Sequence, residues 1–178
     1  MTGSNDDRGF SLIETTISLG ILTGVLLGVA MVLTMTLQMI KSAPGDLTAT
    51  NKAVEAIESI VSARDTRTLS WAQIRNVEGE SGNDGGVFLD GPQPIRFPGS
   101  DGLVSTADDE DVETVTLPGN DQLLGTPDDE TVSLDAFSRE IEFHDLGPDL
   151  RSITVTVRYR VGAETRTYRI DTYVSNYS

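Results

Sequence analysis

The chain contains no cysteine, one histidine and one tryptophan among its 178 residues. The absence of cysteine excludes disulfides, thiolate nucleophiles and cysteine-ligated zinc. Cations are scarce as well: 13 Lys and Arg oppose 28 Asp and Glu, which gives a formal net charge of -15. Because Lys and Arg bind nucleic-acid phosphates, this balance argues against a nucleic-acid partner. The single imidazole, His144, has no serine nucleophile motif near it, so we do not expect an enzyme.

Charge is almost missing from residues 10–40, where Glu14 is the only ionisable side chain. As a helix this segment extends about 46 Å, more than the ~30 Å hydrocarbon core of a bilayer. It is apolar on every side, which favours a membrane-spanning helix. A soluble domain of this size could not bury such a helix as its core. A secretory signal peptide would have a shorter apolar run, with small residues after it rather than before it.

Residues 8–14 read RGFSLIE and lead directly into the apolar segment. This string resembles the class III signal of type IV pilins and type II secretion pseudopilins, although the residues before it are acidic where basic leaders are common. The resemblance implies that residues 1–9 are a leader, that a prepilin peptidase cuts between Gly9 and Phe10, and that the new amine of Phe10 is methylated. It further implies a single-pass protein of the bacterial inner membrane that later joins a periplasmic or extracellular filament.

Glu14 needs a reason to lie in an apolar helix, because a carboxylate there costs about 2.5–3.5 kcal/mol on insertion scales. Cleavage after Gly9 would create a free amine four residues earlier, on the same helix face. That amine could neutralise Glu14 in its own chain or in the adjacent subunit. We therefore expect Glu14 to set subunit register, the alternative being a carboxylate that reaches the lipid headgroups.

Gly20, Gly24 and Gly28 recur every four residues, as in helices that pack closely against one another. This spacing fits side-by-side packing with other pilin subunits in a filament. Ordinary glycine enrichment in membrane helices is the alternative explanation.

Residues 41–46, with Pro44, are expected to interrupt the helix, because proline removes a backbone donor and clashes with the preceding turn. A second helix over residues 46–69 should then pack on the head, residues 70–178. Its apolar stripe follows the 3.6-residue period. The stripe comprises Val54, Ile57 and Val61, with Ala53, Ala56 and Ile60 beside them.

The strongest strand signals are residues 150–161 and 164–175, where apolar and polar residues alternate. Gly162-Ala163 between them suits a type II′ hairpin turn. That turn places Val157 opposite Tyr168. Residues 139–144, 87–89 and 95–97 are further candidate strands. We predict an α+β fold, a long N-terminal helix packed on a small antiparallel β-sheet, which the pilin resemblance also implies.

Residues 98–114 and 118–134 form an internal repeat with an offset of 20 and nine identical positions. We call them the first and second repeat. Each places one Asp seven residues before an Asp-Asp-Glu cluster. Oxygen-rich, Gly-containing loops suit calcium, and dense like charge would be relieved by a divalent cation. The candidate ligands are Asp101, Asp108, Asp109, Glu110, Asp111, Asp121, Asp128, Asp129 and Glu130.

Two other interpretations of the repeat remain. The loops could be solvated acidic segments without an ion. Asp108 and Asp109 could also be imagined as an acid–base pair, but adjacent carboxylates rarely flank one scissile bond.

The favoured function is a structural one, a minor pilin or pseudopilin assembled through its N-terminal helix. A minor subunit is preferred because long acidic insertions would crowd a densely repeated surface. The alternative is an unprocessed single-span membrane protein whose head binds a partner in a calcium-dependent way.

Overall fold

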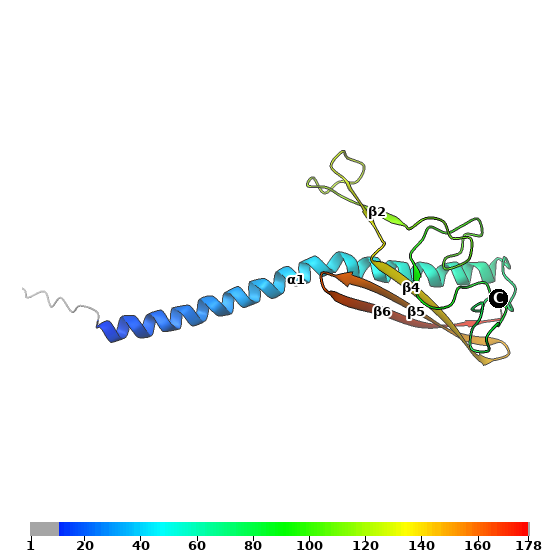
Figure 1. Ribbon diagram of the computed structural model, residues 1–178, viewed down its shortest axis with the longest axis horizontal. Coiled ribbons are helices and arrows are strands. Elements are labelled where there is room, and N and C mark those ends of the chain that lie inside the picture. Colours follow the sequence, from blue (N-terminus) through cyan, green and yellow to red (C-terminus); the bar gives the residue numbers. More distant parts are fainter. Residues whose placement is uncertain (1–10, 178) are drawn as a thin grey trace, which may run out of the picture. The chain divides into compact units, whose positions relative to one another are not determined.

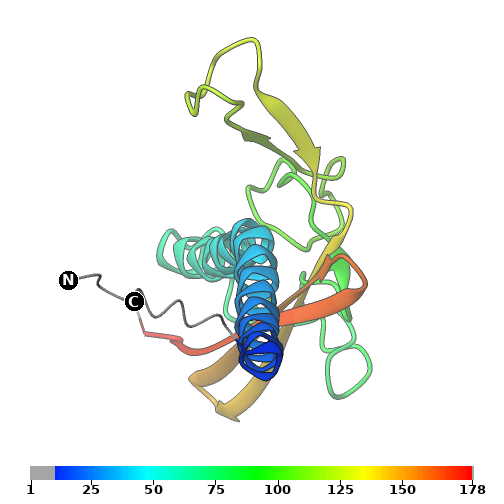
Figure 2. The ribbon, with the colours of Figure 1, turned by 90° about the vertical axis from the view of Figure 1, so that its left-hand side faces the viewer.

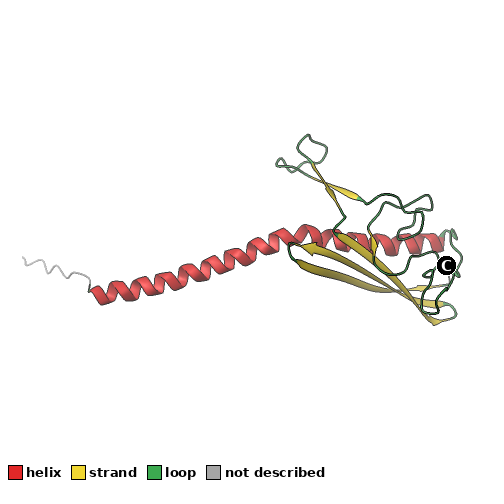
Figure 3. Cartoon of the chain, viewed as in Figure 1, coloured by secondary structure: helices red, strands yellow, loops and turns green. Residues whose placement is uncertain are grey.

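The computed structural model describes residues 11–177, in two compact units that meet between Ala43 and Pro44. The first unit contains the N-terminal part of helix α1 (Leu12–Asp65). The second, the head, contains the rest of α1 and all of the strands (Figure 3). The chain thus combines a long apolar N-terminal helix with a small antiparallel sheet, a mixed α+β arrangement.

Helix α1 is continuous where two separate helices were expected, so the predicted interruption at residues 41–46 is wrong. The proline removes one backbone donor, but α1 runs through it from Leu12 to Asp65. The helix also continues beyond the proline, where the Thr48 hydroxyl donates to the Pro44 carbonyl oxygen at 2.9 Å. The helix ends at Asp65, four residues before the end predicted at residue 69.

The main sheet has the strand order β1-β4-β5-β6, with every neighbour antiparallel. Its strands are β1 (Gln93–Pro94), β4 (Phe137–Gly147), β5 (Leu150–Val161) and β6 (Glu164–Ser175). The predicted hairpin is confirmed, because Val157 pairs with Tyr168 and Val155 with Ile170. Gly162 has a φ of 63°, as a type II′ turn requires at this position.

One strand prediction is confirmed with longer bounds, and two others are wrong. The strand predicted at residues 139–144 is the middle of the longer β4. The candidates at residues 87–89 and 95–97 are isolated bridges, Asn76 to Phe88 and Arg96 to Val112, rather than strands. The acidic repeat, expected to be loop throughout, contains the two-stranded sheet of β2 (Thr114–Leu117) and β3 (Glu130–Ser133). Both of these short strands contain Val and Thr, whose β-branched side chains favour strand pairing.

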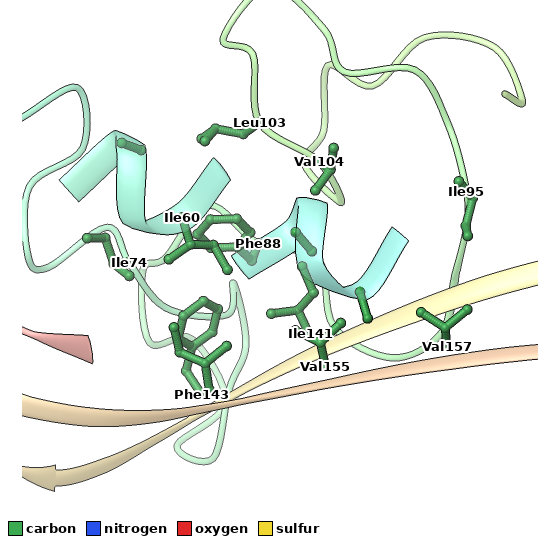
Figure 4. Packing of buried hydrophobic residues seen from close by; sticks show 14 of the residues in the cluster. Ile60, Ile74, Phe88, Ile95, Leu103, Val104, Ile141, Phe143, Val155 and Val157 are labelled. Atoms are coloured by element: carbon green, nitrogen blue, oxygen red, sulfur yellow. The ribbon is translucent and has the colours of Figure 1, made fainter. Parts of the chain in front are cut away.

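The head's core lies where α1 packs against the sheet and the loops (Figure 4). The helix face that is buried is lined mainly by alanine, whereas Val54 of the predicted stripe is 36% exposed. Small side chains let the helix approach its neighbours closely, so the alanine line lies inside, together with Ile60. The buried helix residues are Ala49, Ala53, Ala56, Ile60 and Ala63.

Candidate functional site

The N-terminal part of α1 is long and apolar enough to cross a membrane. Residues Leu12–Leu37 have a mean hydropathy of 2.3, and none of the most apolar window is buried. Length and composition are the basis for this assignment, and a signal sequence near the N-terminus would meet the same criteria. The predicted cleavage and methylation residues, Gly9 and Phe10, lie outside the described residues.

Glu14 lies in the first turn of α1, where its backbone N–H donates to the Ser11 carbonyl at 3.0 Å. Its side chain is exposed. Gly20, Gly24 and Gly28 are exposed too, and a Cβ added at any of them would meet nothing within 4 Å. Nothing inside the chain therefore requires glycine at these three positions.

The first repeat is a loop whose aspartates accept hydrogen bonds from its own backbone. The Asp101 carboxylate accepts the Leu103 N–H at 2.8 Å, and the Asp109 carboxylate accepts the Ser105 N–H at 2.8 Å. Asp108 accepts the Asp101 N–H at 3.3 Å. These bonds fix the turns of the loop in the way that Asp side chains commonly do.

The second repeat makes the same hydrogen bonds at positions 20 residues later. Asp121 accepts the Leu123 N–H at 2.9 Å, and Asp129 accepts the Gly125 N–H at 2.6 Å. Asp128 accepts the Asp121 N–H at 3.3 Å. The two repeats therefore have the same local fold, which their shared sequence pattern explains.

Glycine is needed at the start of both loops. A Cβ on Gly99 would come 2.2 Å from the Asp108 carbonyl oxygen, and one on Gly119 would come 2.2 Å from that of Asp128. This close approach accounts for the Pro-Gly pair that opens each repeat.

Both loops also contain two residues with left-handed backbone conformation, and glycine occupies a different one in each. Gly102 has a φ of 69° and Ser105 of 62°, whereas the equivalent residues Gln122 and Gly125 have 58° and 89°. A side chain in this region costs roughly 1–2 kcal/mol, so each repeat retains one strained residue.

Replacing Gln122 with glycine should relieve that strain. We expect the β2–β3 hairpin to gain a few tenths to about 1 kcal/mol, after subtraction of glycine's greater freedom in the unfolded chain. Native-state amide exchange of residues 114–133 measures this gain. The reverse change Gly102→Gln, which meets no neighbouring atoms, should destabilise the first repeat by a similar amount. If the exchange rates were unchanged in both variants, the left-handed backbone of Gln122 would not be strained.

The pKa values of the neighbouring residues Asp108 and Asp109 in the first repeat depart from the ordinary value in different ways. A hydrogen bond from the Thr106 hydroxyl lowers the pKa of Asp108, as one from Thr126 lowers the pKa of Asp128 in the second repeat. Burial instead raises the pKa of Asp109. The pKa values of Asp108 and Asp109 thus shift in opposite directions, because the Asp108 carboxylate is solvated and the Asp109 carboxylate is partly buried.

The second repeat should consequently loosen in acid. A carboxyl group whose pKa is lowered on folding stabilises the fold above its ordinary value of 3.8, and this contribution is lost as the pH falls through the lower folded-state pKa. An NMR titration of the Asp121 amide, which donates to Asp128, should give a midpoint below 3.8. A midpoint at or above 3.8 would contradict the assignment, and Asp128→Asn should remove the transition.

The calcium prediction is not decided by these contacts. Within residues 11–177, no group of three or more His, Asp and Glu side chains is arranged to hold a metal ion. Glu110 and Asp111 contribute backbone hydrogen bonds to Phe97, and Glu130 lies in β3 opposite Leu117. The hydrogen bonds to Asp101, Asp108 and their equivalents already offset part of the like charge that we expected an ion to relieve. Calcium binding stays a prediction, which calorimetric titration of the full chain with calcium chloride tests.

Arg139 is the central polar residue of the head, and sequence reasoning missed it. Its side chain is fully buried, and its Nε donates to the Ser105 hydroxyl at 3.1 Å. Burial lowers its pKa, while the carboxylates of Glu55, Asp109 and Glu113 raise it. The alternation along the strand could have predicted this burial, because Arg139 lies on the same inward face as Ile141 and Phe143.

Arg151 is a second buried cation, 2% exposed on β5. Its guanidinium lies 4.1 Å from the centre of the Trp71 ring and donates to the Ile74 carbonyl at 2.8 Å. Its Nε donates to Asp145 at 2.6 Å. Arg151 therefore ties residues 71–74, which have no strand or helix of their own, to the sheet. His144, by contrast, lies on the surface, where it pairs with Glu80.

Comparisons of the chain with protein-family models, with curated proteins and with solved structures give no match.

Proposed function

We propose that this protein is a structural subunit, a minor pilin or pseudopilin, that is cut after Gly9 and assembled through its N-terminal helix. The observation that carries the proposal is an apolar helix exposed on its whole circumference, with a single carboxylate in its first turn. Within the described residues, none of its most apolar window is buried, as expected of a packing element. Other subunits and membrane lipid are the partners that suit it.

The head supports the same proposal. The C-terminal part of α1 contributes one face to a core with an antiparallel sheet, the plan that the pilin resemblance implies. The three exposed glycines offer close approach to neighbouring helices, because their surroundings within the chain are open. Each feature is expected of a subunit whose N-terminal helix is buried only after assembly.

Mass spectrometry of the N-terminal peptide, from membrane and sheared-surface fractions of the native host, tests the processing step. We expect a chain that begins at Phe10 with a methylated amine. An intact Met1, or a cut after the apolar helix, would overturn the proposal. An intact Met1 would favour the unprocessed single-span protein, and a cut after the helix would indicate a discarded signal.

Replacing Glu14 with alanine or glutamine tests the assembly step. If the carboxylate is neutralised by a neighbouring Phe10 amine, either variant should lower the amount of protein in the sheared fraction at least about tenfold, while membrane insertion persists. Glutamine keeps the size of the side chain, so a loss shared by both variants identifies the charge as the cause. Thr16→Ala, in the same exposed part of α1, is the control. Assembly of Glu14→Ala at the wild-type level would refute the role of Glu14.

A further inference from the structure

The two repeats have one local fold but opposite surroundings. Leu103 and Val104 of the first repeat are 3% and 1% exposed, whereas the equivalent Leu123 and Leu124 are 62% and 66% exposed. The second pair lies in the loop between β2 and β3, which projects from the rest of the head (Figures 1 and 2). We call residues 118–129 the projecting loop.

The first repeat shows what kind of surface this loop fits. Leu103 and Val104 join the apolar core around α1, as Figure 4 shows. Beside them, Ser105 accepts a hydrogen bond from Arg139, and the Asp109 carboxylate interacts electrostatically with the same guanidinium. The receiving surface is thus apolar and is flanked by an arginine.

The projecting loop cannot reach such a surface within its own chain while the hairpin is intact. Strands β2 and β3 pair over four residues each, from Thr114 opposite Ser133 to Leu117 opposite Glu130. At about 3.3 Å per residue, this ladder holds the tip roughly 13 Å beyond its base. Leu123 and Leu124 are thus accessible to another molecule.

The head carries a surface hollow with matching chemistry. It has a volume of about 520 Å³ and lies where β4 begins and β5 ends. Its apolar lining is formed mainly by Phe137, which is half-buried and stacks on the Tyr159 ring with centroids 5.2 Å apart. Tyr159 itself is only 3% exposed, so Phe137 presents the apolar surface. Arg158 and Arg160 lie beside the rings. Arg158 pairs with Glu140, and Arg160 forms no ion pair with another described residue.

Charge favours this hollow over a lipid surface as the binding site. The projecting loop contains Asp121, Asp128 and Asp129, Glu130 follows it directly, and the segment has no Lys or Arg. Anionic headgroups would repel it, whereas the hollow has two arginines against one aspartate, Asp135.

We propose that the projecting loop of one molecule docks in the hollow of a second copy of this chain, with Leu123 and Leu124 against the Phe137 ring and its carboxylates near Arg160. The contact joins two different surfaces, so it is head-to-tail and can be repeated along a row of molecules. It gives the acidic insertion a place in a repeated row, which weakens the crowding argument for a minor subunit. It does not depend on cleavage at Gly9.

The lack of cysteine makes a clean cross-linking test possible. Two full-length single-cysteine variants, Leu124→Cys and Ala136→Cys, carry different tags and are mixed in detergent micelles under mild oxidation. We expect the mixed disulfide to form in clear preference to either homodimer. Leu146→Cys, at an equally apolar exposed position on β4 (55% exposed), replaces Ala136→Cys as the matched control and should form little mixed product.

Disruption of the contact completes the test. Leu123→Ser in the Leu124→Cys chain, or Arg160→Glu in the Ala136→Cys chain, should lower the mixed product about tenfold or more. Neither side chain is buried in the separate head, so circular dichroism should show unchanged folding. Equal cross-linking with Leu146→Cys, or no effect of either disrupting change, would overturn the proposal. So would transfer of a fluorophore at Leu124→Cys into lipid when vesicles are added.

Discussion

Replacing Arg139 with alanine should lower the free energy of unfolding of the head by about 3–5 kcal/mol. The change removes the guanidinium that interacts electrostatically with the carboxylates of Glu55, Asp109 and Glu113, and it leaves a void in the core. Lys52 still pairs with Glu55 and Glu113, so the charge left without a cation is chiefly that of the partly buried Asp109. Urea unfolding of the full chain in detergent, followed by Trp71 fluorescence, measures the loss.

Two further variants separate the causes of that loss. Arg139→Met fills most of the space without supplying charge, so the part of the loss that it retains is electrostatic. Arg169→Ala removes an exposed cation that pairs with Asp171, and such surface pairs contribute about 0–1 kcal/mol. If Arg139→Ala cost no more than Arg169→Ala, the central role of Arg139 in the head would be refuted.

Leu103→Ala and Leu123→Ala should have very different effects, although the two residues occupy the same position of the repeat. Leu103 is 3% exposed in the core, so its truncation should cost about 2–5 kcal/mol. Leu123 is 62% exposed, and its truncation should change the stability of the separate molecule by less than about 0.5 kcal/mol. The same unfolding experiment compares both variants with wild type.

This comparison is internally controlled, because the surrounding loop has the same hydrogen bonds in both repeats. Equal losses would mean that the second repeat is covered within its own chain, which would also remove the basis for docking between molecules. A loss for Leu123→Ala that appears only at high protein concentration would support that docking.

Several features of the fold were predictable from the sequence because they depend on local patterns. The alternation in residues 150–175 and the Gly162-Ala163 turn defined the β5–β6 hairpin and its register. The apolar run after residue 10 predicted the N-terminal part of α1. The continuity of α1 past Pro44 was not predictable from the proline alone, because the flanking turns and the packing of the following residues outweigh one missing hydrogen bond.

The helix face and the repeat were harder to predict for a different reason. Alanine is only weakly hydrophobic, so the sequence pattern predicted Ala53 and Ala56 at the edge of the apolar stripe. In the structure both residues are fully buried at the centre of the packed face. The two repeats are similar in sequence, yet only one is buried. Their burial depends on where the flanking strands carry them, which is a property of the tertiary fold.

The duplicated loop also affects how this protein can change over evolutionary time. In the first repeat, any substitution at the apolar pair must satisfy the interior of the head. In the second, the same backbone scaffold is maintained by its own aspartates, and the apolar pair is free of that constraint. Substitutions at the tip can therefore accumulate one residue at a time without loss of foldability.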